Sequence, residues 1–469
     1  MRRHVFLLSV GLLLSPAVAS AGGGRARKPG GEAALALGRA YAASYAWSRY
    51  HAIPSFSRQT GLACNVCHTA FPMLTTFGRQ FKLNGYTMTG LQTIGGGQNQ
   101  ELKINLIPPV STMFQTSLTQ TSKAQPGTQN GNVEFPQELS VFFGEAISQR
   151  MGTFIQITYD ATEGSLGIDN IDLRYANHGK IGSKPVLYGF TVNNSPTVQD
   201  VWNTTPVWGY PFGSSGVAPT PAAAPLINEG LAQSVAGFGS YALWNEHVYG
   251  ELSVYRSAPQ GGAHPPDASS ELITKGVTPY WRFAYQRNVG KHYVELGTFG
   301  MASSLYPTGV TGPTDRYDDI GADLQVERHV GKGGAGNFVL HASYIHEHQT
   351  LDATFAAGES NAKNDLNTVR ADASWLTPTR WGGTLGAFST SGTADTLRYA
   401  PGDVTGSATG KPNSSGYIAE LQFMPWINTR FSVQYVGYQK FNGESSNYDG
   451  AGRSASDNNT LYVLVWLMF

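Results

Sequence analysis

The last ten residues of the chain read Thr460-Leu461-Tyr462-Val463-Leu464-Val465-Trp466-Leu467-Met468-Phe469. Every second residue from Leu461 to Phe469 is apolar. Successive side chains of a β-strand point to opposite faces, so a strand here would have one wholly apolar face. An apolar strand face that ends in an aromatic residue is typical of barrels that cross the bacterial outer membrane. Because lipid offers no hydrogen bonds to the backbone, this stretch predicts a closed, membrane-spanning β-barrel.

An alternation of apolar and polar residues recurs in segments from about residue 100 onward. One clear example is Ile155-Gln156-Ile157-Thr158-Tyr159-Asp160. Such segments are half-buried strands with one apolar face and one polar face. We predict an all-β, antiparallel outer-membrane barrel of about sixteen strands. Their starts are expected near Ile104, Val133, Met151, Ile168, Pro185, Ser234, Val248, Thr278, Lys291, Tyr317, Asn337, Asp365, Arg380, Gly416, Thr429 and Thr460.

The predicted connections between strands alternate in length. Ser148-Gln149-Arg150 and Thr377-Pro378-Thr379 are short, whereas residues 195–232 and 392–415 are long. Short turns on the periplasmic side and long loops outside are typical of outer-membrane barrels. The connection after the tenth strand is of middle length and the loop after the third is short, so the rule has exceptions. A soluble β-sandwich or propeller, the alternative fold, predicts no such sidedness.

The composition agrees with an exterior that faces lipid. Charged residues make up only 14% of the chain, whereas soluble globular proteins carry about 25%. Lys and Arg number 32, as do Asp and Glu, so no net field favours nucleic acid as a partner. Charged residues on the predicted inward faces should keep a wet lumen soluble, and a subset could dock another segment or guide cations. These residues are Asp160, Asp172, Arg174, Glu251, Arg282, Glu295, Asp323, Glu327, Arg370, Asp372 and Glu420.

The N-terminus has the pattern of a secretory signal peptide. A charged start precedes an apolar core from Val5 to Leu14 and the small residues Ala19-Ser20-Ala21. We therefore predict a signal peptide over residues 1–21. Residues 22–50 are expected to form a linker that includes an Ala-rich helix. The rest of the sequence contains no uninterrupted apolar run of about 20 residues, so no membrane-spanning helix is predicted.

The only two cysteines of the chain, Cys64 and Cys67, are followed at once by His68. This spacing is typical of a c-type haem, in which each thiol adds across one vinyl group and the histidine binds the iron. We predict one covalently bound haem c with His68 as the proximal axial ligand. A zinc site would need two more Cys or His residues, and none lies nearby. A disulfide or a redox dithiol is the remaining alternative.

The stretch after this motif predicts a helix. Pro72 can open a helix, and Asn84-Gly85 is a stop signal. Between them, Leu74, Phe77 and Phe81 recur at helical spacing. One apolar helix face of this kind would cover a haem edge, and the haem would supply much of the core of so small a unit.

Three further motifs carry a family resemblance. They are Ser57-Arg58-Gln59-Thr60-Gly61, Phe77-Gly78-Arg79-Gln80-Phe81-Lys82-Leu83-Asn84-Gly85-Tyr86 and Val192-Asn193-Asn194-Ser195-Pro196-Thr197-Val198-Gln199-Asp200-Val201-Trp202-Asn203-Thr204-Thr205-Pro206. In these residues the chain resembles the fused outer-membrane cytochrome–porins of iron-oxidising bacteria. The resemblance implies that the protein oxidises extracellular ferrous iron and passes the electron through its haem to a periplasmic carrier, a cytochrome or a cupredoxin.

We accordingly expect a monohaem cytochrome segment over residues 51–98 and the barrel over residues 99–469, in the outer membrane of a Gram-negative bacterium. An even strand number keeps both barrel ends on the periplasmic side, where the haem segment would enter the lumen. Met88 is the first choice for the distal axial ligand, because His/Met ligation raises the potential of the haem iron. His51 and Met73 are its rivals.

A docking site for ferrous iron is harder to predict. His346 and His348 would lie on one face of a strand near its outer end, with Asp352 beyond, and these side chains offer nitrogen and oxygen ligands. The simpler interpretation is that they are solvated rim residues. Two other functions stay open: a diffusion porin whose haem segment plugs the lumen, and outward electron transfer to an external acceptor.

Overall fold

The computed structural model describes residues 54–88, 93–94, 104–105, 109–161, 164–206, 208–258, 265–267, 272–330, 336–426 and 428–469. The predicted signal peptide (residues 1–21), the predicted linker (residues 22–50) and the candidate ligand His51 lie outside the described residues.

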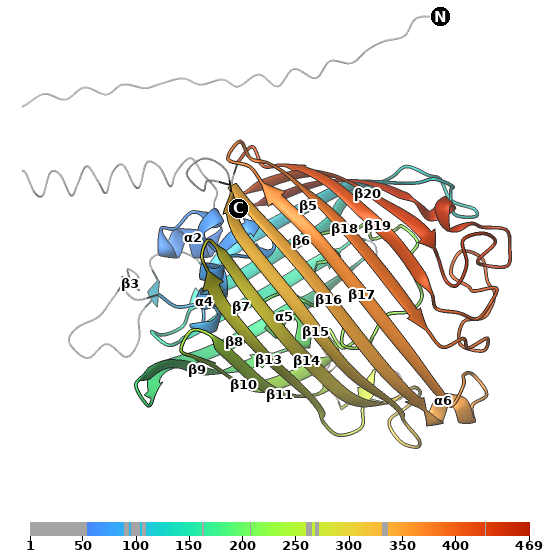
Figure 1. The fold of residues 1–469 in the computed structure, drawn as a ribbon, viewed down its shortest axis with the longest axis horizontal. Coiled ribbons are helices and arrows are strands. Elements are labelled where there is room, and N and C mark those ends of the chain that lie inside the picture. The colour runs from blue at the N-terminus through green and yellow to red at the C-terminus, as the bar shows by residue number, and fades with distance from the viewer. Residues whose placement is uncertain are drawn as a thin grey trace, which may run out of the picture. The chain divides into compact units, whose positions relative to one another are not determined.

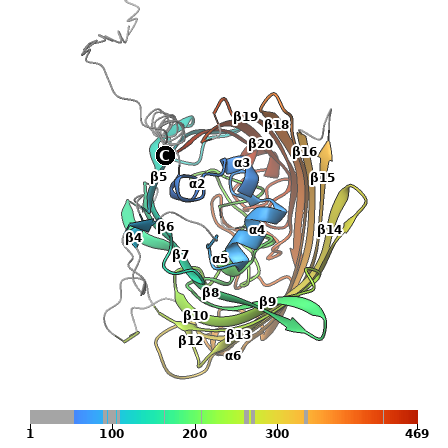
Figure 2. The same ribbon diagram turned by 90° about the vertical axis from the view of Figure 1, so that its left-hand side faces the viewer.

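Sixteen long strands in the described part of the chain form a closed antiparallel barrel, as the sequence predicts (Figures 1 and 2). Each strand pairs with its neighbours in the sequence, and the last strand closes the barrel on the first. The two-residue strand β12 (Ile273–Thr274) adds a short pairing with β14. The long strands are β5 (Val110–Thr121), β6 (Asn132–Ala146), β7 (Met151–Asp160), β8 (Ser165–Ile181), β9 (Lys184–Asn193), β10 (Val235–Trp244), β11 (Val248–Ser257), β13 (Thr278–Val289), β14 (His292–Tyr306), β15 (Asp315–Val330), β16 (Gly336–Leu351), β17 (Lys363–Leu376), β18 (Trp381–Gly392), β19 (Ser414–Phe423), β20 (Thr429–Lys440) and β21 (Thr460–Met468).

Fifteen of the sixteen predicted strand starts lie within three residues of the observed starts. The exception is the first strand. It was expected near Ile104, but the barrel strand β5 begins at Val110. Ile104 instead belongs to β4 (Ile104–Asn105), which pairs with β3 (Thr93–Ile94) outside the barrel. Two consecutive prolines at positions 108 and 109 separate β4 from β5. Because proline has no backbone N–H to donate to a ladder, the barrel strand starts after them.

The outward faces of the strands are apolar and most inward faces are polar, whereas the last strand is apolar on both faces. On β21, Leu461 is exposed on the outside, whereas Tyr462, Leu464 and Trp466 are buried inside the barrel. Large apolar side chains such as Leu252 are exposed around the barrel wall, which fits a surface in contact with lipid. The chain thus folds as an outer-membrane-type β-barrel. Among the helices that the structure describes, none combines the length and the apolar character that a membrane crossing needs.

The two ends of the barrel differ in their connections, as predicted. At one end the strands are joined by short connections such as residues 147–150, 182–183 and 245–247, and we call this the tight-turn end. At the other end, the long-loop end, the connections include residues 194–234 and 393–413. The start of β5 and the end of β21 both lie at the tight-turn end. Short turns face the periplasm in outer-membrane barrels.

Small elements from the N-terminal part of the chain occupy the lumen near the tight-turn end, and Figure 2 shows their helices inside the ring of strands. They are α2 (Ser55–Thr60), α3 (Cys64–Cys67), β1 (His68–Ala70), β2 (Met73–Leu74) and α4 (Thr76–Leu83). Three short helices belong to the long-loop connections: α5 (Pro196–Gln199), α6 (Asp352–Ala356) and the 3-10 helix η2 (Ala455–Asn458).

The connection of residues 194–234 folds into the lumen, where it contacts many strands. Asp200 lies 3.6 Å from Arg282 of β13. The backbone N–H of Leu226 donates to Glu347 of β16 at 2.6 Å. The hydroxyl of Tyr210 donates to a backbone oxygen of β17 at 2.7 Å. The lumen that the sequence suggested would be wet is therefore largely filled by this connection and by the N-terminal helices.

Placing a charge on the lipid-facing wall should destabilise the barrel. Leu252, in the middle of β11, is 70% exposed on the outer face. We expect Leu252→Arg to lower the free energy of unfolding in lipid by about 2 to 4 kcal/mol, because the guanidinium must enter hydrocarbon. Val310→Arg, in an exposed connection outside the strands, is the control and should change little. Urea titration in bilayers measures both, and equal losses would argue against a lipid-facing wall at β11.

Candidate functional site

The predicted helix after the cysteine motif is shorter than the sequence suggested. It was expected to open at Pro72, but α4 begins at Thr76, and the residues just after Pro72 form β2. Thr75 is the N-cap, because its hydroxyl accepts a hydrogen bond from the backbone N–H of Gly78 at 3.1 Å. The predicted stop is confirmed, since Asn84 caps the C-terminal end of α4.

The cysteine motif is held tightly against α4. Cys64 and Cys67, both free thiols, form the two ends of the one-turn helix α3. The hydroxyl of Thr75 donates to the backbone oxygen of Val66 at 2.6 Å. A Cβ added at Gly78 would lie 2.2 Å from the backbone oxygen of Cys67, so α4 can approach α3 this closely only with glycine at that position.

His68 follows the second cysteine directly and is oriented by the backbone. Its Nδ1 lies 3.2 Å from the carbonyl oxygen of Pro72, a distance that suits a hydrogen bond from a protonated Nδ1. In that tautomer Nε2 is left with a free lone pair. Burial lowers the pKa of His68 to about 4, so the imidazole is neutral at physiological pH.

The side chains of Cys64, Cys67 and His68 all line one cavity inside the barrel, which we call the motif cavity. It encloses about 1420 Å³ of empty space, part of it continuous with solvent. Burial raises the pKa of Cys67 to about 11, with a smaller contribution from Cys64, so the thiols stay protonated at neutral pH.

The rest of the motif cavity is built from all three parts of the lumen. The N-terminal segment contributes aromatic rings, among them Phe77 and Phe81 at the helical spacing that the sequence predicted. The barrel wall contributes Met113, Phe142, Phe154, Trp466 and Met468. The connection of residues 194–234 contributes Val201 and Trp208, so the cavity exists only when these parts are docked together.

Two polar atoms on the wall of the motif cavity lack a partner. Within the residues that the structure describes, the indole nitrogens of Trp208 and Trp466 are buried without any hydrogen bond. An indole N–H is a donor only, and burying it unpaired is unfavourable. A ligand that carries acceptor groups would remove this cost.

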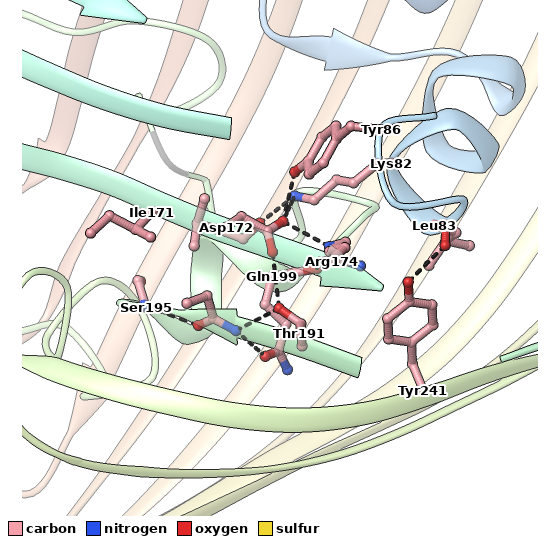
Figure 3. Close-up of polar contacts among 12 residues, drawn as sticks. Lys82, Leu83, Tyr86, Ile171, Asp172, Arg174, Thr191, Ser195, Gln199 and Tyr241 are labelled. Carbon is pink, nitrogen blue, oxygen red and sulfur yellow. Dashed lines mark hydrogen bonds and ion pairs between the residues drawn. The ribbon is translucent and has the colours of Figure 1, made fainter. Parts of the chain in front are cut away.

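Inward charges of the barrel wall hold the N-terminal segment in place (Figure 3). The hydroxyl of Tyr86 donates to Asp172 of β8 at 2.6 Å, and Lys82 lies 3.9 Å from the same carboxylate. Arg174, two residues along β8, pairs with Asp172 at 2.7 Å. Tyr241 of β10 adds a hydrogen bond of 2.7 Å to the backbone oxygen of Leu83.

A second ion pair docks the same segment on the other side of the lumen. Arg79 of α4 lies 2.6 Å from Glu327 of β15, and its guanidinium stacks over the ring of Tyr293 at 4.5 Å. The sequence favoured lumen solubility as the role of the inward charges. For Asp172 and Glu327 the structure favours the other role considered, docking of a segment.

A second cavity adjoins the motif cavity and is polar. We call it the acidic cavity, because Glu138, Asp160 and Asp169 line it. Trp208 and Trp466 line both cavities and therefore stand at their boundary.

The strand register places the acidic cavity toward the long-loop end. On β6, which ends at the tight-turn end, Phe142 lines the motif cavity and Glu138, four residues earlier, lines the acidic cavity. On β7, which starts at the tight-turn end, Phe154 lines the first cavity and Thr158 the second. The two cavities thus follow one another along the barrel.

The histidines suggested for iron docking lie elsewhere. His346 and His348 share one face of β16, as predicted, and it is the outward face, because Glu347 between them is buried inside. His348 lies 2.7 Å from Asp365 of the neighbouring strand. Asp352 is exposed at the start of α6. Within the described ranges, no three His, Cys, Asp or Glu side chains are grouped in a way that could hold a metal ion.

The methionines suggested as a distal ligand are not on the wall of the motif cavity. Met73 packs in a separate cluster with Phe212 and Val339, and Met88 is absent from the described lining. Met113 and Met468 line the cavity instead. Sequence reasoning missed them. The one signal available was their place on the inward faces of the first and last barrel strands.

Comparisons with known proteins give only a weak likeness to solved outer-membrane proteins. No family model matches the chain, and no curated protein matches it. The anion-selective porin from Comamonas acidovorans has 11% identity over 77% of this chain and 98% of its own, with a TM-score of 0.44. OmpT of Vibrio cholerae, expressed in the outer membrane, has 9% identity over 81% and 100%, with a TM-score of 0.42. Scores of this size carry no argument, so the barrel assignment rests on the strand pairing itself.

Breaking the buried ion pair between Asp172 and Arg174 should strongly destabilise the folded barrel. Asp172 and Arg174 are completely buried, so Asp172→Asn leaves the Arg174 guanidinium without its counter-charge. We expect a loss of about 3 to 5 kcal/mol in the free energy of unfolding. Limited proteolysis should also cut the segment around Tyr86 faster, because its anchor is weakened.

The chain provides a matched control for this change. Arg316 and Asp318 are also two residues apart on one strand and also 2.7 Å apart, but both are exposed. Asp318→Asn should cost no more than about 1 kcal/mol. Similar losses for the two variants would contradict the docking role of Asp172.

Proposed function

We propose that this outer-membrane barrel carries one c-type haem in the motif cavity, oxidises ferrous iron from outside the cell and passes the electron to a periplasmic carrier. The observation that carries the proposal is that both cysteines of the chain and the adjacent His68 open onto a single cavity inside a closed barrel. A disulfide or redox dithiol would not require a cavity lined mainly by apolar side chains beside it.

The residues of the motif cavity fit a covalently bound haem. Cys64 and Cys67 would form the two thioether bonds, and His68 would bind the iron through Nε2 while Nδ1 donates to Pro72. Metal-ligating histidines commonly donate their second nitrogen to a backbone carbonyl in this way. The unpaired indole N–H groups of Trp208 and Trp466 are suited to acceptor groups such as porphyrin carboxylates. When bound, the haem supplies one-electron chemistry between ferric and ferrous iron.

The acidic cavity supports an approach of iron from the long-loop end. Two of its acidic side chains, Asp160 and Asp169, would raise the local concentration of a divalent cation. Trp208 and Trp466 separate this cavity from the motif cavity, so the metal does not need to reach the haem. One ferrous ion would lose one electron and leave as ferric iron on the outer side.

The placement of the motif cavity supports electron exit on the periplasmic side. It lies at the tight-turn end, and tight turns face the periplasm in outer-membrane barrels. A periplasmic cytochrome or cupredoxin would accept the electron there. The electron thus crosses the membrane while the iron stays outside.

Ferrous iron should reduce the haem of membranes that contain this protein. The measurement is the change of the haem absorption spectrum after mixing under anaerobic conditions. We expect C64A/C67A to lose covalent haem and the spectral change but still to fold as a heat-modifiable barrel, because both cysteines belong to the lumen segment. A wild-type haem that ferrous iron leaves oxidised would refute the oxidase proposal.

The same preparation separates the two other functions. A diffusion porin predicts steady ion conductance in planar bilayers, which the filled lumen should suppress. Outward electron transfer predicts a haem midpoint potential well below that of the iron couple.

The route of iron can be tested by neutralising the acidic cavity. We expect D160N/D169N to slow haem reduction at low iron and low salt by about tenfold, because these carboxylates no longer attract the cation. The haem spectrum should not change. H346A/H348A, on the outer wall, is the comparison and should leave the rate unaltered. If the histidine variant were slow and the carboxylate variant normal, iron would dock at the outer wall instead.

A further inference from the structure

We propose that Met113, on the barrel wall, is the second axial ligand of the haem iron. The inference rests on the proposed haem in the motif cavity. It assigns the distal ligand to a strand of the barrel and not to the N-terminal segment that contains the cysteines. The iron would then bond the segment through His68 and the wall through Met113.

The lining of the motif cavity limits the choice. Among the described residues, His68 is the histidine on this wall, and the sulfur-bearing side chains other than the cysteines are Met113 and Met468. These two methionines are direct cross-strand neighbours on β5 and β21, at the seam where the barrel closes. Both side chains face inward from strands that touch the segment.

Burial and hydrogen bonding favour Met113 over Met468. Met113 is completely buried, packed with Cys64 and Phe71 of the segment, whereas Met468 is only partly buried at the edge of the same cluster. The Nε2 of Gln115 donates to the Met113 sulfur at 3.5 Å. This contact orients the thioether, and since a thioether sulfur has two lone pairs, one remains for a metal.

A wall ligand has physical consequences for the haem. Methionine opposite histidine raises the reduction potential of haem iron, which suits an acceptor of electrons from ferrous iron. A bond from the iron to β5 would also fasten the N-terminal segment inside the lumen. Loss of the segment from the lumen would then require loss of the sixth ligand.

The test uses the purified holoprotein and its Met113→Leu variant, which keeps the volume and removes the sulfur. We expect the ferric M113L haem to lose the red charge-transfer band and the magnetic circular dichroism signal of a sulfur ligand, to bind added imidazole and to have a lower midpoint potential. Met301→Leu, a buried methionine in a different cluster, is the control and should keep the wild-type spectrum.

A second variant distinguishes ligation from packing. Met113→His should give a six-coordinate, low-spin haem with two nitrogen ligands, which a role in packing alone would not produce. A sulfur signal that persists in M113L, or that disappears in M468L and not in M113L, would overturn the assignment. Wild-type holoprotein without a sulfur signal would overturn it too, and a wild type without covalent haem would instead refute the proposed function.

Discussion

A strand inside a membrane must have every backbone group paired, because hydrocarbon offers no alternative partner. Closure of the barrel meets this requirement, and it depends on the pairing of β21 with β5, from Thr460 opposite Thr121 to Met468 opposite Met113. These two strands stand at opposite ends of the barrel sequence. Without their pairing both would present open edges, and the wall that supports the N-terminal segment would not exist.

Closure also forces the polar faces of sixteen strands into one lumen, where charges need partners. Arg282 lies within 3.6 Å of Asp200 and closer still to Glu295 and Asp323, so it joins the lumen connection to two strands. Burial of charge is costly unless it is paired, and each such pair has good geometry only when the connection and the segment are in place. The polar interior therefore specifies how the lumen is filled.

The filled lumen is organised along the barrel axis. The apolar motif cavity lies near the tight-turn end and the acidic cavity lies beyond it, with Trp208 and Trp466 between them. An apolar site stabilises a bound macrocycle, and a carboxylate-lined site attracts cations. Residues 194–234 are central to this arrangement, because they contribute to both walls. From the sequence, this connection is recognisable only by its length, but in the structure it is the element that divides the lumen.

The sequence by itself determined the barrel, the outward face of each strand, the sidedness of the connections and the cysteine–histidine motif. All of these are local patterns with a period of two or a fixed spacing, so they can be read without knowing any distant contact. Only the tertiary structure decided that residues 194–234 turn inward, that Asp172 holds Tyr86, and that Met113 reaches the cavity while Met88 does not line it. Those facts depend on register and closure between strands hundreds of residues apart, which no local pattern encodes.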